Sequence, residues 1–240
     1  DVSGGPASVL GGTDDGTAPL NLPFAFSFYG QSYTQVCVSS NGAIYFAPSA
    51  ASCAGVADFA NIDLALTTPN DWPAIFPYWT DPSFQAPGAG SVFYQAVGAA
   101  GSRRFVIQWN NAMPGSSASP VTFQAILTEG SNTILFQYKT VTLGGGNPAT
   151  NGAQATVGIR NIAGNTNNRL IAWSFNAPVQ RDGAAILFGA QPAGDSTPPV
   201  VTASAAPNRL WPPNGKTVNV TVSGTIHDAA SAIDPSSAAF

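Results

Sequence analysis

The chain has 240 residues, of which 44% are hydrophobic and only 8% are charged. This length supplies enough apolar side chains for a large buried core, but the surface has far less charge than an ordinary cytosolic protein. The formal net charge is −4, and the 8 Lys and Arg residues are scattered along the chain. These properties exclude a basic surface for nucleic acid, and the lack of an apolar run of about 18 residues excludes membrane insertion.

Two features of the sequence indicate a secreted protein. The chain begins with Asp1 rather than Met, as expected after removal of a signal peptide, although a cut chain would look the same. Cys37 and Cys53 are predicted to form a disulfide, because closing a loop of about 15 residues stabilises a fold by roughly 3 kcal/mol in an oxidising compartment. Two buried free thiols are the alternative, and a metal pair is disfavoured because the chain has one His.

Strands are predicted throughout the first 190 residues. The 25 Gly and 20 Pro residues would interrupt long helices almost everywhere, whereas short β-branched and aromatic runs recur between turn signals. These runs are 24–29, 35–39, 43–46, 91–97, 104–109, 122–127, 133–138, 155–159, 170–175 and 184–188. Their number and spacing predict an all-β fold, an antiparallel, jelly-roll-like β-sandwich.

Turns, one helix and two core residues are also predicted from local patterns. Asn41-Gly42 and the segment 129–132 are typical hairpin turns. Residues 58–66 have apolar side chains at helical spacing, so they are the single plausible helix. Trp109 and Trp173 lie inside strand patterns and are expected in the core.

A second module is predicted after a change of composition. Residues 1–193 form the main sandwich domain, 194–199 a Pro-rich linker, and 200–240 a partial immunoglobulin-like β module in which 200–204 and 217–224 alternate as strands. An immunoglobulin-like sandwich needs about 100 residues. We therefore expect either that the chain was cut or that a neighbouring molecule supplies the missing strands, because two strands alone bury too little.

Five segments of the predicted sandwich carry a family resemblance: 22–30, 38–42, 75–81, 104–111 and 122–130. Together they resemble the nidogen-like extracellular domain of large secreted bacterial proteins. The resemblance covers roughly residues 8–190, and segment 207–216 is similar to the start of the Ig-like repeats that often follow such domains. The resemblance implies an extracellular stalk or adhesive surface, and it brings no catalytic residues to transfer.

The residue inventory argues against an enzyme. His227 is the single His and lies in the second module, so the main domain lacks a Ser-His-Asp or Cys-His arrangement. Glu129 is the single Glu and is expected at a solvated hairpin tip, a poor position for the general acid of a glycosidase. No catalytic residue and no cofactor is predicted.

Two kinds of binding residue remain as candidates. Asp14, Asp15 and Asp81 are weak candidates for Ca²⁺ ligands, together with Asp58, Asp63 and Asp71, although turn formation through Asx hydrogen bonds is the better interpretation.

Trp72, Tyr78 and Trp79 lie close together in a Pro-rich segment and could stack on sugar rings. A lid over the core is the alternative that aromatic burial favours.

The sequence therefore predicts a non-catalytic structural or adhesive subunit of the cell surface. Copies of the chain would assemble into a filament or surface layer by β-strand pairing, through residues 200–240 or the Gly-rich N-terminus. The expected partners are other copies of the chain or other cell-surface proteins. A carbohydrate-binding adhesin, with a glycan as ligand, is the alternative.

Overall fold

The computed structural model describes residues 1–3, 5, 7–47, 49–54, 59–66, 72–115, 119–161, 170–189, 200–206 and 221–227. The chain divides into two compact units, Asp1–Gly189 and Ala190–Phe240. The predicted linker at 194–199 lies outside the described residues.

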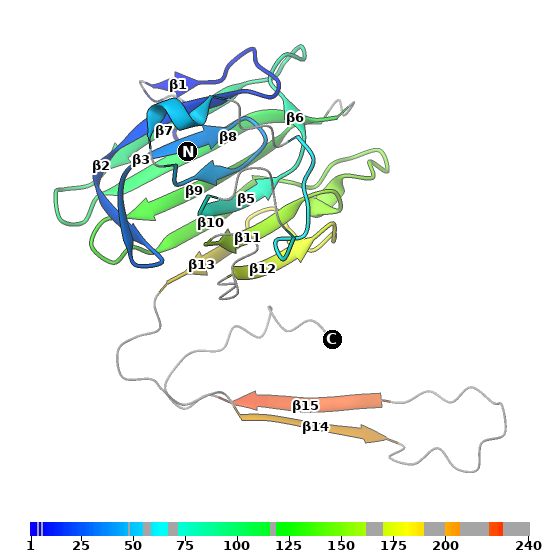
Figure 1. Ribbon diagram of the computed structural model, residues 1–240. Coiled ribbons are helices and arrows are strands. Elements are labelled where there is room, and N and C mark those ends of the chain that lie inside the picture. The colour runs from blue at the N-terminus through cyan, green and yellow to red at the C-terminus, as the bar shows by residue number, and fades with distance from the viewer. Residues whose placement is uncertain are drawn as a thin grey trace. The chain divides into compact units, whose positions relative to one another are not determined.

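The first unit consists of two β-sheets whose paired strands are all antiparallel (Figure 1). In spatial order, the seven-stranded sheet contains β1 (Ser8–Val9), β7 (Ser91–Val97), β8 (Arg104–Pro114), β9 (Val121–Thr128), β10 (Ile134–Thr140) and β13 (Ala185–Phe188), with β6 (Pro82–Ser83) paired to β8. The six-stranded sheet contains β12 (Leu170–Phe175), β11 (Thr156–Arg160), β5 (Ala74–Trp79), β4 (Ile44–Tyr45), β3 (Gln31–Ser39) and β2 (Thr17–Phe28). The predicted all-β sandwich is confirmed.

Most connections join neighbours within a sheet. The chain runs through β2, β3, β4 and β5 as one meander and through β7, β8, β9 and β10 as another. This order is simpler than the alternation between sheets of a jelly roll, because most links are short turns that return the chain to the adjacent strand. The long link is 46–73, between β4 and β5. At the predicted Asn41-Gly42 turn, Gly42 has a φ of +77°, and a Cβ there would collide with the carbonyl of Tyr78.

The main core lies between the two sheets and follows from period-2 alternation along the strands. In β2, Leu20, Leu22, Phe24, Phe26 and Phe28 are buried. The other sheet contributes Trp109, Phe123 and Phe136, which are fully buried. The indole Nε1 of Trp109 also donates to the carbonyl of Ser39 at 2.8 Å, a hydrogen bond that joins the two sheets.

A second apolar cluster covers the outer face of the six-stranded sheet. It includes Tyr45, Phe76 and Trp79 from the strands and Leu64 from the connecting segment. The predicted disulfide between Cys37 and Cys53 is confirmed, with the two Cα atoms 5.5 Å apart. It ties β3 to a short 3₁₀ helix, η1 (Ala50–Cys53), in the segment that covers this face.

The helix predicted at 58–66 is wrong over the described residues 59–66, which have irregular structure. The Thr156 hydroxyl accepts from Asn61 Nδ2 at 3.1 Å and donates to the carbonyl of Ile62 at 2.8 Å. These bonds hold the segment in an irregular conformation against β11. They outweigh the helical spacing of its apolar side chains, because such a local preference is weaker than tertiary contacts. Asp63 forms an Asx turn, accepting from the backbone N–H of Ala65 at 2.9 Å.

The described part of the second unit is a pair of antiparallel strands, β14 (Val200–Ala206) and β15 (Thr221–His227). Residues 207–220 and 228–240 lie outside the described residues, so the Ig-like module remains a prediction. Among the described residues, no helix is long and apolar enough to cross a membrane.

Candidate functional site

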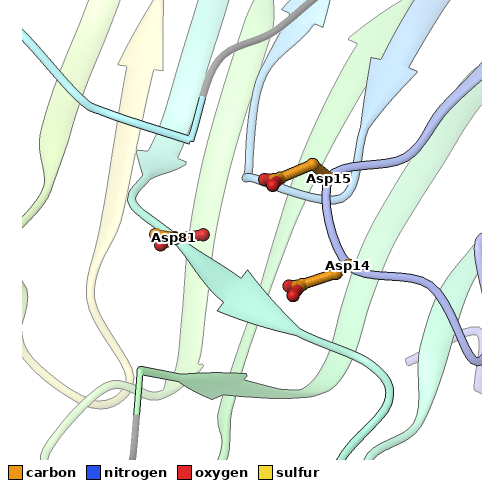
Figure 2. Close-up of side chains that lie close together, drawn as sticks. All are labelled: Asp14, Asp15 and Asp81. Atoms are coloured by element: carbon orange, nitrogen blue, oxygen red, sulfur yellow. The ribbon is translucent and has the colours of Figure 1, made fainter.

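Three of the predicted calcium ligands meet at one end of the sandwich. Asp14 and Asp15 lie in the loop between β1 and β2, and Asp81 lies between β5 and β6. Figure 2 shows their side chains turned toward a common space from these two segments. One carboxylate oxygen from each lies within 4.8 Å of the others, and all three residues are exposed.

Hydrogen bonds hold this acidic loop in place. The Ser40 hydroxyl donates to the carbonyl of Asp14, and Asn41 Nδ2 donates to Asp15 Oδ1 at 2.9 Å. The backbone N–H of Thr80 donates to the carbonyl of Asn41 at 3.1 Å, so the β3–β4 turn also positions the end of β5. Ser40 and Asn41 are fully buried, which makes this turn a rigid support for the acidic side chains.

The three carboxylates border an open pocket of about 290 Å³. Its lining residues are Asp14, Asp15, Phe59, Asp81, Ser83 and Gly115. Carboxylates this close repel one another, so a cation between them would be stabilised, and Ca²⁺ accepts six to eight oxygen ligands of this kind. Three carboxylates would leave the remaining positions to water. Calcium binding at this site stays a prediction.

Of the other acidic candidates, the structure describes Asp63, which is not part of this cluster. The structure uses Asp63 for its Asx turn, as the alternative interpretation expected. Asp58 and Asp71 lie outside the described residues.

The predicted sugar-stacking platform of Trp72, Tyr78 and Trp79 is not supported, because two of its rings are buried on opposite faces of β5. Tyr78 is 1% exposed and packs in the inter-sheet core, while Trp79 is 2% exposed and stacks on Phe76 at 4.8 Å. Burial raises the pKa of Tyr78 to about 12. Trp72 is partly buried against the outer cluster. The alternative interpretation, a lid over the core, describes these residues better.

Glu129 is held in an ion pair rather than free at a hairpin tip. Arg103 donates to both of its carboxylate oxygens, at 2.9 and 2.7 Å, and the backbone N–H groups of Gly101 and Arg103 donate to Oε2 at 2.8 and 3.0 Å. The hydrogen bonds from Arg103, first from its side chain, lower the pKa of Glu129 from 4.5 to about 2. This carboxylate therefore stays ionised at neutral pH, which is the wrong state for a general acid.

The N-terminus is docked on the sheet of its own chain. Val2 is buried against Val106 and Ile126 on the outer face of the seven-stranded sheet. Its backbone N–H donates to Gln108 Oε1 at 3.1 Å, and the Asp1 carboxylate pairs with Lys139 at 2.7 Å. Asp1 and Val2 therefore contact the chain's own sheet.

An exposed apolar surface was missed from the sequence. Ile171, Trp173 and Phe175 of β12 are 52%, 41% and 42% exposed, and we call these three residues the β12 rim. The prediction that Trp109 is in the core is confirmed, but the same prediction for Trp173 is wrong. The apolar run of β12 looked like a buried strand, whereas the topology places β12 at the edge of its sheet.

A β-bulge explains how Trp173 comes to face solvent. Val157 of β11 is opposite Ser174 and the next residue, Gly158, is opposite Ala172, which leaves Trp173 as an extra residue. Such a bulge bends an edge strand and redirects its side chains. Phe175 is paired with Thr156 of β11, and Thr156 is paired on its other side with Trp79 of β5. Directly paired residues point to the same face of a sheet, and Trp79 belongs to the outer cluster, so Phe175 also lies on the outer face.

The two antiparallel sheets, the core between them and the disulfide on the outer face define a disulfide-containing β-sandwich domain. Residues 2–185 match the model of a family described as NIDO related. The chain therefore belongs to the NIDO-related family, which confirms the nidogen-like resemblance seen in its sequence. Searches among curated proteins and among solved structures found no match.

Proposed function

We propose that this chain is a non-catalytic structural or adhesive domain of an extracellular assembly, and that it associates with copies of itself. The observation that carries the proposal is the β12 rim, an uncovered apolar surface at the edge of an antiparallel sheet. Large exposed apolar side chains gathered on one edge are typical of an interaction surface.

The disulfide and the composition support the extracellular part of the proposal. A disulfide such as Cys37–Cys53 persists in oxidising compartments and is rare in the cytosol. Only 8% of the residues are charged, so neutral residues cover most of the surface. Such a surface suits packing against similar molecules, since little charge has to be desolvated.

The state of Glu129 supports a role other than catalysis. Acid catalysis by a carboxyl group needs a raised pKa, whereas the ion pair with Arg103 lowers the pKa of Glu129. Because Glu129 is the one Glu of the chain, carboxyl chemistry would fall to aspartates such as those around the exposed pocket.

Analytical ultracentrifugation over a range of protein concentrations tests the proposal. We expect the average mass to rise with concentration at physiological ionic strength, and to rise further when salt increases, because apolar contacts are strengthened by excluded salts such as sulfate. A particle that stays monomeric up to millimolar concentration would contradict the proposal. The carbohydrate-binding alternative loses its predicted platform, because Tyr78 and Trp79 are buried.

A further inference from the structure

We infer that the first step of assembly is a closed pair, in which the β12 rims of two copies pack on each other about a two-fold axis with Trp173 as the anchor. This inference rests on the proposed self-association and names its surface and partner. The partner is a second copy of this chain.

The rim is better suited to side-chain packing between two copies than to hydrogen-bonded pairing of their β12 strands. The bulge at Trp173 interrupts the regular alternation of backbone groups along β12. It also directs the largest side chain of the strand outward, where 41% of its surface is exposed. Trp is the residue most enriched among those that dominate binding energy, and a central, desolvated position is where it contributes most.

The exposed apolar area is a sizeable part of what each half of a dimer interface buries. An aromatic side chain offers 150–250 Å² in full, so Trp173 and Phe175 together leave roughly 120–200 Å² uncovered. Ile171 is about half exposed and brings the total to on the order of 200 Å². One side of a standard interface buries about 800 Å², of which roughly 60% is apolar. The rim therefore supplies somewhat less than half of that apolar area.

The charge pattern suits a contact between identical surfaces. Around a two-fold axis each residue faces the same region of the other copy, so a charged side chain on the strand would meet its own charge. The six residues of β12, Leu170–Phe175, contain no ionisable side chain. Within the strand itself, two copies therefore bring no like charges together.

The opposite edge of the same sheet disfavours a head-to-tail contact, which would extend into an open filament. Pro19 and Pro23 of β2 have no backbone N–H, and the N–H of Ser27 already donates to Asn132 Oδ1 at 2.8 Å. The exposed residues of this strand include Asn21, Ala25 and Ser27, which are small or polar. Because β2 presents neither large apolar side chains nor a full set of donors, β12 fits another β12 better than it fits β2.

Cysteine cross-linking distinguishes the two arrangements. Ala172 and Ala25 are exposed alanines in the two edge strands, and both native cysteines are already in a disulfide. We expect Ala172→Cys to form a covalent dimer under mild oxidation, since position 172 lies beside the axis, and Ala25→Cys to remain monomeric on a non-reducing gel. A dimer from Ala25→Cys but not from Ala172→Cys would overturn the inference.

A second pair of variants tests the anchor without relying on cross-linking. Leu187 of β13 is 66% exposed and is paired with Leu135 on the outer face of the other sheet, which makes it a matched control. We expect Trp173→Ser to weaken association at least tenfold and Leu187→Ser to change it less than threefold, with both variants keeping the wild-type circular dichroism spectrum.

The outcomes separate the inference from the proposed function. If the wild-type chain is monomeric at all concentrations, both are wrong. If it associates but neither Trp173→Ser nor Ala172→Cys has the expected effect, the two-fold contact is wrong while self-association stands.

Discussion

The six-stranded sheet ends in two different edges. At one end β2 alternates buried apolar residues with small or polar exposed ones, and it contains Pro19 and Pro23. At the other end β12 has no proline and exposes Ile171, Trp173 and Phe175. Prolines and polar residues are common means of keeping an edge strand from pairing with another chain. The contrast indicates that one edge is closed to partners and that the other is open.

Contacts from the opposite sheet complete the closure of β2. The turn between β9 and β10 reaches β2 through Asn132, which accepts from the backbone N–H of Ser27. Close by, the Arg103 guanidinium lies 5.6 Å from the centre of the Phe24 ring and is itself fixed by Glu129. In the described part of the chain, no strand is paired with the outer side of β12. The two edges therefore differ in backbone chemistry as well as in exposed side chains.

The largest expected effect is a difference in stability between two Phe→Ala variants, one at each edge of the sheet. Phe26 of β2 is fully buried and stacks on Phe46, so Phe26→Ala should lower the free energy of unfolding by about 3–5 kcal/mol. Phe175→Ala should cost about 1 kcal/mol, because 42% of that side chain is already exposed. Urea denaturation of both variants measures the difference. Equal losses would mean that β12 is packed as a core strand.

Removing the disulfide should affect stability near β2 and leave β12 unchanged. The bond between Cys37 and Cys53 fixes η1 beside β2, where the Thr17 hydroxyl donates to the carbonyl of Cys53 at 2.7 Å. We expect the double variant Cys37→Ala, Cys53→Ala to lose about 2–4 kcal/mol of unfolding free energy. Its concentration-dependent mass should match that of the wild type. A loss of association in the folded variant would link the covered face to the interface.

Removing the contact between Asn132 and β2 should lower the free energy of unfolding by a smaller amount. Asn132 has a φ of +53°, so Asn132→Gly removes the side chain without straining the turn. We expect a loss of about 0.5–1.5 kcal/mol and faster hydrogen exchange at the Ser27 amide, which loses its acceptor. Ser131→Gly in the same turn is the control and should leave the Ser27 amide protected. Unchanged exchange in Asn132→Gly would show that this contact does not close β2.

The ion pair beside β2 should give the smallest effect, and it depends on pH. The pKa of Glu129 is lowered from 4.5 to about 2 in the folded chain, so its stabilising contribution is complete above pH 4.5. It is lost as the pH falls from 4.5 toward 2, because the unfolded chain then takes up the proton first. Wild type should unfold at a higher temperature than Glu129→Gln at pH 7, and the difference should disappear near pH 2. A constant difference would contradict the pKa shift.

The sequence predicted most strands because their pattern is local. Nearly every strand of the first unit coincides with an apolar or alternating run, and the turn at Asn41-Gly42 has the positive φ that such a turn needs. The exceptions are the two-residue strands β1 and β6 and the longer β5, whose Pro77 is unusual in a central strand. The register between β5 and β11 shifts between Thr156 and Gly158, so the proline lies at an irregular position in the ladder.

The edges could not be predicted, because the order of strands depends on contacts between distant segments. The run 170–175 is as apolar as a buried strand, and nothing within it shows that a neighbour is missing on one side. For the same reason, Trp173 was expected in the core, whereas the structure leaves it 41% exposed. Tyr78 and Trp79, the candidate platform, are buried, which agrees with the alternative that aromatic burial favoured. Asp14, Asp15 and Asp81 were identified by residue type, whereas their meeting depends on the turn at Ser40 and Asn41.

Hydrogen–deuterium exchange measured at low and high protein concentration tests the difference between the two edges most directly. If β12 is the surface through which copies meet, amides within 170–175 should exchange more slowly as concentration rises, while those of 17–28 should keep one rate. Slower exchange in β2, or no change in either strand as the mass increases, would contradict the account.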